Sequence, residues 1–458
     1  MENENKENKR VEESTEIFEK APVPKAVLKN ALPAMAAMLM VMIYNLADAF
    51  FIGQTGDDYQ VAAVSLAMPV FLLFMSAGTI FGLGGTSVIS RALGQKRLEY
   101  AKKVCSFCMW CCVGVGVIMA ACYLIFMDQI LSVIGASADT WDYTKSYLTI
   151  VSFCGPFVLI SNCFTNVIRA DGHSTQAMLG QFIGNLLNVI LDPVFILGFG
   201  WGISGAAVAT VIGNVVGACY YLVYFLRGKS ILSIHPKYFT AGEGVCSGVL
   251  AIGVPAALGS AMMSVSNIVI NNQMSNYGDM AVAGMGIAMK IVTMAGMVCM
   301  GLGQGVQPVL GYCVGAKMWD RFKKVLNFSL KFALCLGIVL TSLCFIFAGP
   351  IVNVFLTDPD AYSYAVRFAR ILLPTNAVFG VYHVLLNTLQ AMGAATPALI
   401  INLSRQGFIF IPTLFILQAF LGITGIVFAQ PVADILSIIL AAVLYTRYSR
   451  KMMKQNAA

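Results

Sequence analysis

Residues 41–53 read VMIYNLADAFFIG and place one carboxylate, that of Asp48, inside an otherwise apolar stretch. From Ala31 to Gly53 no other acidic or basic side chain occurs. A transmembrane helix needs about 20 mostly apolar residues, so this stretch is long enough to cross a bilayer. An Asp in the middle of a span costs roughly 2.5–3.5 kcal/mol on insertion scales, so it is usually paired, facing a cavity or functional. We therefore expect a transmembrane helix that carries a functional acid.

A second apolar stretch repeats this feature. Residues 188–193 read NVILDP, and Asn188 and Asp192 are four residues apart, which places them on one face of a helix. Two carboxylates held together in a dry site cannot easily both ionise, so such a pair favours the uptake of a proton. The alternative is that each acid is structural and bonded to nearby backbone. The cost of burial favours a function for both.

Composition places the whole chain in a membrane. Of 458 residues, 58% are hydrophobic and only 11% are charged, and the mean hydropathy is +0.78. These values are too apolar for a soluble globular protein and predict an all-α polytopic membrane protein. The first 20 residues are polar and lack the apolar core of a secretory signal. We expect residues 1–24 to form a disordered cytoplasmic tail.

Hydropathy predicts twelve spans. Their approximate ranges are 31–53, 61–90, 104–127, 143–165, 177–199, 204–226, 247–275, 281–311, 325–348, 362–386, 397–418 and 423–446. Alternate linkers lack Lys and Arg and carry Asp instead, whereas the intervening linkers and the tail are basic. By the positive-inside rule, both termini are cytoplasmic.

The two halves of the chain are similar to each other at a spacing of about 221 residues. For example, Gly82 and Gly84 correspond to Gly303 and Gly305. Six spans have therefore been duplicated, and an even repeat predicts two six-helix lobes related by a pseudo-twofold axis along the membrane normal. The expected parts are an N-terminal lobe, a cytoplasmic linker, a C-terminal lobe and a cytoplasmic tail, over residues 25–226, 227–246, 247–446 and 447–458.

Five segments carry a resemblance to a known family: residues 48–53 (DAFFIG), 82–85 (GLGG), 91–94 (RALG), 191–196 (LDPVFI) and 202–207 (GISGAA). In this order and spacing the chain resembles the multidrug and toxic compound extrusion (MATE) transporters, closest to the bacterial DinF-like and MepA-like branch. The resemblance implies export of amphipathic, often cationic drugs, driven by inward flow of H+ or Na+. It also implies a multi-pass protein of the bacterial cytoplasmic membrane, surrounded by lipid, which we expect to be a monomer.

The resemblance places the coupling-ion site of this branch in the N-terminal lobe. The matching positions are Asp48, Asn188, Asp192 and Thr210. Carboxylate, amide and hydroxyl oxygens also suit Na+, so the choice between H+ and Na+ stays open. In the second lobe the repeat replaces Asp192 with Ile411, which favours coupling through the first lobe.

Candidate substrate residues follow from shared helix faces and from apolar surroundings. Tyr44 lies one turn before Asp48, and the other candidates in the same lobe are Asn162, Asn166, Met178 and Gln181. In the second lobe, Lys290 either binds an anionic substrate group, pairs with Asp434 or reaches a local carbonyl. In that last case Arg405 and Asp434 extend to the cytoplasmic interface.

Proline inside the first and seventh spans indicates bending. Pro33 and Pro255 occupy equivalent places in the repeat, and a proline removes one helical hydrogen bond. The resemblance links the Pro33 region to bending during transport.

Other functions are less consistent with the sequence. A flippase for lipid-linked saccharides is the nearest alternative, but it would carry extra spans and a strongly basic cavity. An enzyme would need a catalytic constellation, and the three His residues have no metal spacing. No Walker motif or dinucleotide fingerprint occurs, so we expect no nucleotide cofactor. We also expect no other cofactor and no metal beyond Na+. The net charge of +7 reflects basic linkers that set topology, so we expect no nucleic-acid partner.

Overall fold

The computed structural model describes residues 15–355 and 358–455, and every regular element among them is a helix. The elements of the first half are α2 (Val23–Gly53), α3 (Asp58–Gly94), α4 (Leu98–Ile125), α5 (Met127–Val133), α6 (Ala138–Phe153), α7 (Gly155–Ala170), α8 (Ser174–Pro193), η1 (Val194–Gly198), α9 (Gly202–Leu226) and η2 (Pro236–Tyr238). Those of the second half are α10 (Val245–Ser275), α11 (Asp279–Gly315), α12 (Trp319–Ile346), α13 (Ala348–Phe355), α14 (Pro359–Ala391), α15 (Ala395–Leu403), η3 (Ser404–Phe408), α16 (Phe410–Leu421) and α17 (Ile423–Gln455).

The predicted number of spans is confirmed. Eleven helical segments of the described chain are long and apolar enough to cross a membrane, and the bent pair α6 and α7 makes a twelfth. The pair bends by 60° at Cys154, and Pro156 stands in the first turn of α7, where its ring and missing N–H favour a new helix start. The short helices α5 and α13 were not predicted.

The prediction of a disordered tail is wrong for part of its length. Residues 15–19 are helical, and the side chains of Ile17 and Phe18 are 8% and 0% exposed. Burial of these two apolar side chains offsets the cost of ordering the segment. Residues 1–14 of the predicted tail lie outside the described residues.

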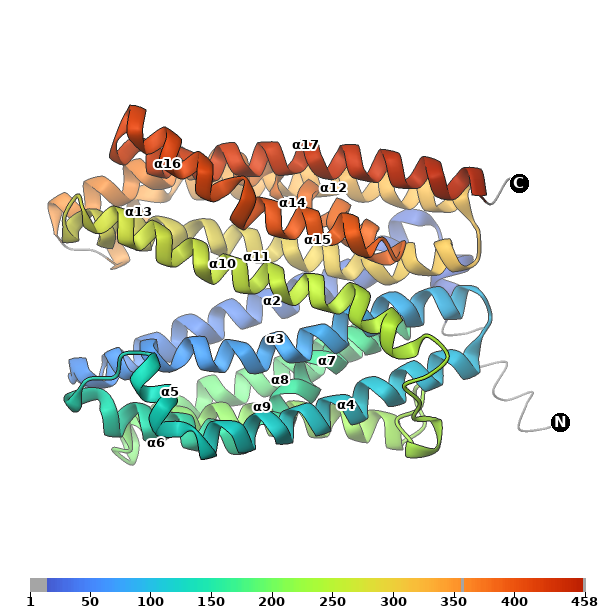
Figure 1. The fold of residues 1–458 in the computed structure, drawn as a ribbon, viewed down its shortest axis with the longest axis horizontal. Helices are drawn as coiled ribbons and strands as arrows, with labels where there is room; N and C mark the ends of the chain where they lie inside the picture. Colours follow the sequence, from blue (N-terminus) through green and yellow to red (C-terminus); the bar gives the residue numbers. More distant parts are fainter. Residues whose placement is uncertain (1–14, 356–357, 456–458) are drawn as a thin grey trace. The chain divides into compact units, whose positions relative to one another are not determined.

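One compact unit contains most of the first half of the chain, with its main body at residues 36–254. Within it α3 packs against α4 and α7, and α8 packs against α9, as Figure 1 shows. The close approach of α3 to α10 requires glycine, because a Cβ on Gly84 would lie 2.9 Å from the carbonyl carbon of Val249.

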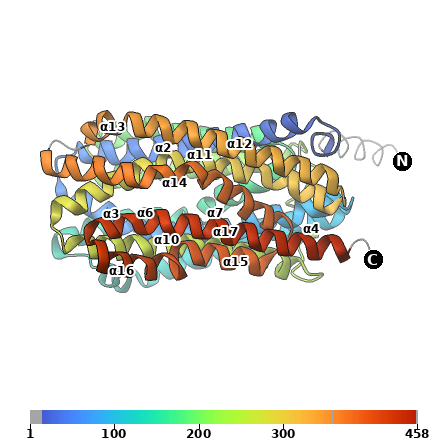
Figure 2. The same cartoon turned by 90° about the horizontal axis from the view of Figure 1, so that it is seen from above.

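The other unit contains most of the second half, where α14 packs against α12 and α17, as seen in Figure 2. Its core is a cluster of buried apolar side chains that includes Phe368, Leu372, Phe410 and Leu414. Gly305, the repeat counterpart of Gly84, again permits helix contact, because its Cβ would lie 2.5 Å from Ala31 Cα. The duplicated glycines therefore serve the same packing function in both halves.

The boundaries of the compact units differ from the predicted lobe boundaries. Residues 22–35, at the start of α2, belong to the second unit, and residues 245–254, at the start of α10, belong to the first. Each of these helices changes unit close to its internal proline, Pro33 or Pro255. The division therefore falls within two helices and not in the linker at 227–246.

Candidate cation-coupling site

The acidic residues of the first half lie on helices that bring them together. Asp48 lies near the end of α2, Asn188 and Asp192 lie on the last turns of α8, and Thr210 lies on α9. All four side chains are buried: Asp48 is 8% exposed and Asp192 is fully buried. The packing of α8 on α9 places the amide and the hydroxyl next to the second acid.

Asn188 connects Asp192 to Thr210. In the amide orientation that satisfies both neighbours, Asn188 Nδ2 donates to Asp192 Oδ2 at 3.0 Å, and Asn188 Oδ1 accepts from Thr210 Oγ1 at 3.3 Å. This orientation is assigned from the hydrogen-bond network. Three of the four residues that the resemblance implies thus form one network, and each link is a hydrogen bond.

Each of the two carboxylates keeps one oxygen without a partner. Asp48 Oδ1 and Asp192 Oδ1 are buried, and neither has a hydrogen-bond partner within residues 15–355 and 358–455. The two acids are also close enough to interact electrostatically. A buried anionic oxygen without a partner is costly, so the arrangement is chemically incomplete until a proton or a small cation binds.

Two tyrosines complete this site. Tyr44 of α2 and Tyr147 of α6 both lie close enough to interact electrostatically with the two carboxylates. Tyr44 was predicted from its position one turn before Asp48. Tyr147 was not, because nothing in the sequence of its span distinguishes it from a lipid-facing tyrosine, whereas in the structure it is only 4% exposed.

A polar stripe extends from the acids along α8. Gln181, Asn185, Asn188 and Asp192 follow one another at helical spacing and share a face. Gln181 Oε1 and Asn185 Nδ2 are buried and lack partners among the described residues. Asn185 was missed by the sequence analysis, although its place between Gln181 and Asn188 is a signal that could have found it.

The remaining candidates of the first half lie elsewhere or have structural partners. Asn162 Nδ2 donates to the Met75 carbonyl at 3.2 Å, which ties α7 to α3. Asn166 Nδ2 donates to the Asn162 carbonyl at 3.0 Å, and its Oδ1 accepts from Arg169 Nη1 at 3.2 Å. Met178 is half-buried on α8. The two asparagine amides are therefore largely used in packing.

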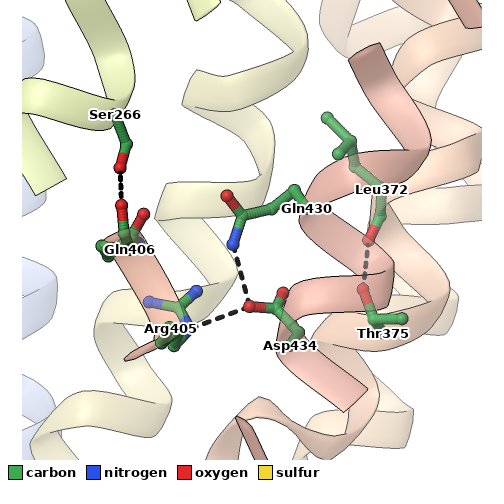
Figure 3. A network of polar contacts seen from close by, with 7 residues as sticks. All are labelled: Ser266, Leu372, Thr375, Arg405, Gln406, Gln430 and Asp434. Atoms are coloured by element: carbon green, nitrogen blue, oxygen red, sulfur yellow. Dashed lines mark hydrogen bonds and ion pairs between the residues drawn. The ribbon is translucent and has the colours of Figure 1, made fainter. Parts of the chain in front are cut away.

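In the second half, the suggested pairing of Lys290 with Asp434 is wrong. Asp434 Oδ1 accepts from Arg405 Nε at 2.8 Å and from Gln430 Nε2 at 2.8 Å, as Figure 3 shows. Lys290 is exposed and its Nζ lies 6.0 Å from the ring centre of Phe355. The Asp434 side chain is only 9% exposed, so it is buried among other side chains of this unit. The alternative that Arg405 and Asp434 extend to the cytoplasmic interface stays a prediction.

Comparison with known proteins identifies the family. Residues 33–194 and 255–416 match the MatE family model, one match in each half. The multidrug export protein MepA of Staphylococcus aureus (strain MSSA476) is 33% identical over 431 residues, which cover 93% of this chain and 94% of that protein. MepA of Staphylococcus haemolyticus (strain JCSC1435) is 32% identical over 428 residues, covering 93% of both chains.

The fold agrees with this assignment. A solved structure described as the outward-facing conformation of a multidrug resistance MATE family transporter superposes with a TM-score of 0.92 at 21% identity. The superposition covers 96% of this chain and 99% of that one. The predicted resemblance is confirmed, and the chain belongs to the MatE family of membrane transporters.

Proposed function

We propose that this protein exports amphipathic organic cations in exchange for inward movement of H+ or Na+, with Asp48 and Asp192 as the coupling site. The observation that carries the proposal is the pair of buried carboxylate oxygens without partners. Similar chains are named multidrug export proteins, which supports drugs as the substrate class.

The site chemistry explains how one cation can compete with another. We propose that a cationic drug is held near Tyr44 and the polar stripe of α8 described above. A proton or Na+ bound at Asp48 and Asp192 neutralises the negative charge that would otherwise attract this drug. Binding of the coupling cation therefore weakens drug binding, and release of the cation restores it. Inward movement of one positive charge contributes about 2.3 kcal/mol per 100 mV of membrane potential.

Transport also requires the protein to change conformation. Pro33 removes a hydrogen bond inside α2, the helix that carries Asp48. We propose that α2 bends at this point when the occupancy of the site changes. The basic linkers predict that both termini lie in the cytoplasm, and we propose that the coupling cation enters from the opposite side.

Ethidium efflux from energised vesicles tests this proposal. The variants are Asp48→Asn and Asp192→Asn, and the control is Asp128→Asn, which removes an acid whose side chain is 66% exposed and paired with Lys145. A Na+ gradient and a pH gradient are imposed separately. We expect the transport rate of both site variants to be at least about ten times lower than that of the wild type, which corresponds to about 1.4 kcal/mol. The control variant should transport at the wild-type rate.

The outcomes separate the parts of the proposal. The gradient that supports wild-type efflux identifies the coupling ion. Efflux by both site variants at the wild-type rate would contradict the assignment of the coupling site. If the wild type moves no cationic dye under either gradient, organic cations are not the substrate class and a lipid-like substrate becomes the better hypothesis.

A further inference from the structure

A buried charge cluster lies inside the second unit, which contains none of the residues of the coupling site. Asp434 and Gln430 come from α17, and Arg405 comes from η3. Arg405 Nε and Gln430 Nε2 both donate to Asp434 Oδ1, and Figure 3 shows the two donors converging on this one oxygen. The acid thus has a full positive charge beside it that belongs to the same chain.

Aromatic rings hold the Arg405 guanidinium in place. Its central carbon lies 4.5 Å from the ring centre of Phe379 and 5.2 Å from that of Tyr382, both on α14. The Arg405 side chain is 14% exposed and that of Asp434 is 9% exposed. A cation packed on two rings and bonded to a carboxylate is stabilised by attraction to both.

The backbone around Arg405 is also specialised. Residues Ser404–Phe408 form a π-helical turn between α15 and α16, a wider turn that occurs frequently at functional sites. Ser266 Oγ of α10 donates to the Gln406 carbonyl in the same turn, which fixes the turn against a second helix. The arginine is therefore presented by a distorted and anchored segment.

The two units balance buried acid in different ways. An amide, a hydroxyl and two phenols lie around Asp48 and Asp192, and one oxygen of each acid has no partner among the described residues. Around Asp434 a guanidinium supplies the missing charge. The first arrangement needs a cation from solution, whereas the second is already neutral.

We propose that Asp434 is a latent site for a monovalent cation, H+ or Na+, and that the Arg405 guanidinium occupies it as a counter-ion built into the chain. In the wild type the second unit then takes up no cation at this acid. Removal of the guanidinium leaves a buried carboxylate with the Gln430 amide beside it and Tyr382 within electrostatic range, which are polar groups suited to a small cation. The other titratable group that faces Arg405 is His383 of α14.

The inference rests on the geometry around Asp434 alone, so it can fail or succeed independently of the coupling site proposed above. Thermal unfolding of the purified full-length protein provides the test. Arg405→Gln removes the counter-ion and keeps the acid. The double variant Arg405→Gln with Asp434→Asn removes both, and it is the matched control because the first unit is unchanged in both proteins.

The midpoint of thermal unfolding is measured in two series. In the first, the Na+ concentration is varied at alkaline pH, with choline replacing Na+. In the second, the pH is varied without Na+. A ligand that binds the folded state better than the unfolded state raises the midpoint. We expect the midpoint of Arg405→Gln to rise by a few degrees more than that of the double variant, with added Na+ or with falling pH. Arg405→Lys, which keeps the positive charge, should respond as the wild type does.

Equal responses of Arg405→Gln and the double variant to both cations would overturn the proposal. If Arg405→Gln does not fold, the folding of the double variant becomes the test of the counter-ion role. Recovery of a folded protein in the double variant would support the counter-ion role, because removal of the acid then restores the balance of charge. Failure of both would overturn it, since the arginine would then be needed for packing against Phe379 and Tyr382.

Discussion

At the scale of single residues, the acids of the candidate coupling site differ from Asp434 in having no cationic partner among the side chains that the structure describes. Asp48 and Asp434 are both carboxylates in apolar helices, and both are largely buried. Asp434 is balanced by Arg405, whereas Asp48 retains a buried oxygen without a partner in the described part of the chain. The same type of side chain is thus paired with a cationic group of the chain in one place and keeps an oxygen without a partner among the described residues in the other.

Asn185 should contribute to substrate binding. Its buried Nδ2 has no partner among residues 15–355 and 358–455, so it can donate to a bound drug. We expect Asn185→Leu to weaken dye binding about fivefold, because a hydrogen bond contributes about 1 kcal/mol, while the maximal transport rate is kept. Dye titration of the purified protein measures the affinity.

The control for this prediction is Gln54→Leu, which removes an exposed amide at the end of α2. An equal loss of affinity in both variants would show a general effect of lost polarity. Unchanged affinity in Asn185→Leu would remove this residue from the binding site.

At the scale of elements, helix packing depends on duplicated glycines. Gly84 of α3 touches the backbone of Val249, whereas Gly114 of α4 has no atom within 4 Å of where a Cβ would stand. Gly84→Ala should lower the free energy of unfolding by about 1–3 kcal/mol through overpacking. Gly114→Ala should leave it unchanged or raise it by up to about 1 kcal/mol.

Thermal unfolding of the two variants in detergent checks this contrast. The two substitutions are chemically identical and both lie inside a long helix, so helix propensity cannot explain a difference in sign. Equal midpoints would mean that α3 and α10 can separate slightly at no cost.

Pro33 should affect the rate of transport more than the affinity for drug. Pro33→Ala restores a backbone donor within α2 and removes the steric cause of bending. We expect transport to slow several-fold while dye binding stays close to the wild-type value. Pro359→Ala is the control, because a proline in the first turn of α14 causes no kink.

Parallel efflux and binding measurements on both proline variants test the prediction. Slower transport in Pro359→Ala as well would indicate a general effect on folding. Wild-type transport in Pro33→Ala would show that α2 does not need to bend at this residue.

At the scale of the whole molecule, the sequence predicts the number of membrane spans well. Long apolar segments must be helical in a bilayer, so hydropathy alone located all twelve spans. It could not predict the break at Cys154, because the predicted span 143–165 reads as one apolar segment. Nor could it predict the partner of Asp434, because pairing with Arg405 depends on how the π-helical turn packs against α17.

The candidate site was partly predictable for a similar reason. Helical spacing joined Asn188 to Asp192, and the family resemblance added Asp48 and Thr210. Tyr147 comes from the first half of a bent helix pair, and its approach to the two acids is a result of tertiary packing. Asn162 and Asn166 were plausible from the sequence, but hydrogen bonds to neighbouring backbone and to Arg169 use their amides.

Both termini are expected in the cytoplasm. A fluorescent protein that folds only in the cytoplasm, fused to the C-terminus, should be fluorescent. An alkaline phosphatase fused after Asp139 should be active, because the linker between the predicted spans 104–127 and 143–165 is expected to face outward. The opposite pattern at both positions would reverse the orientation and therefore the direction of the proposed cation flow.

The most direct test of the coupling site is the affinity of the purified protein for a cationic dye, measured against pH without Na+ and against Na+ at alkaline pH. Wild-type affinity should fall as one of the two cations increases, because cation and drug oppose each other at the acid pair. In Asp48→Asn and Asp192→Asn this dependence should disappear. Wild-type affinity that is independent of both cations, or a dependence that persists in both variants, would contradict the account.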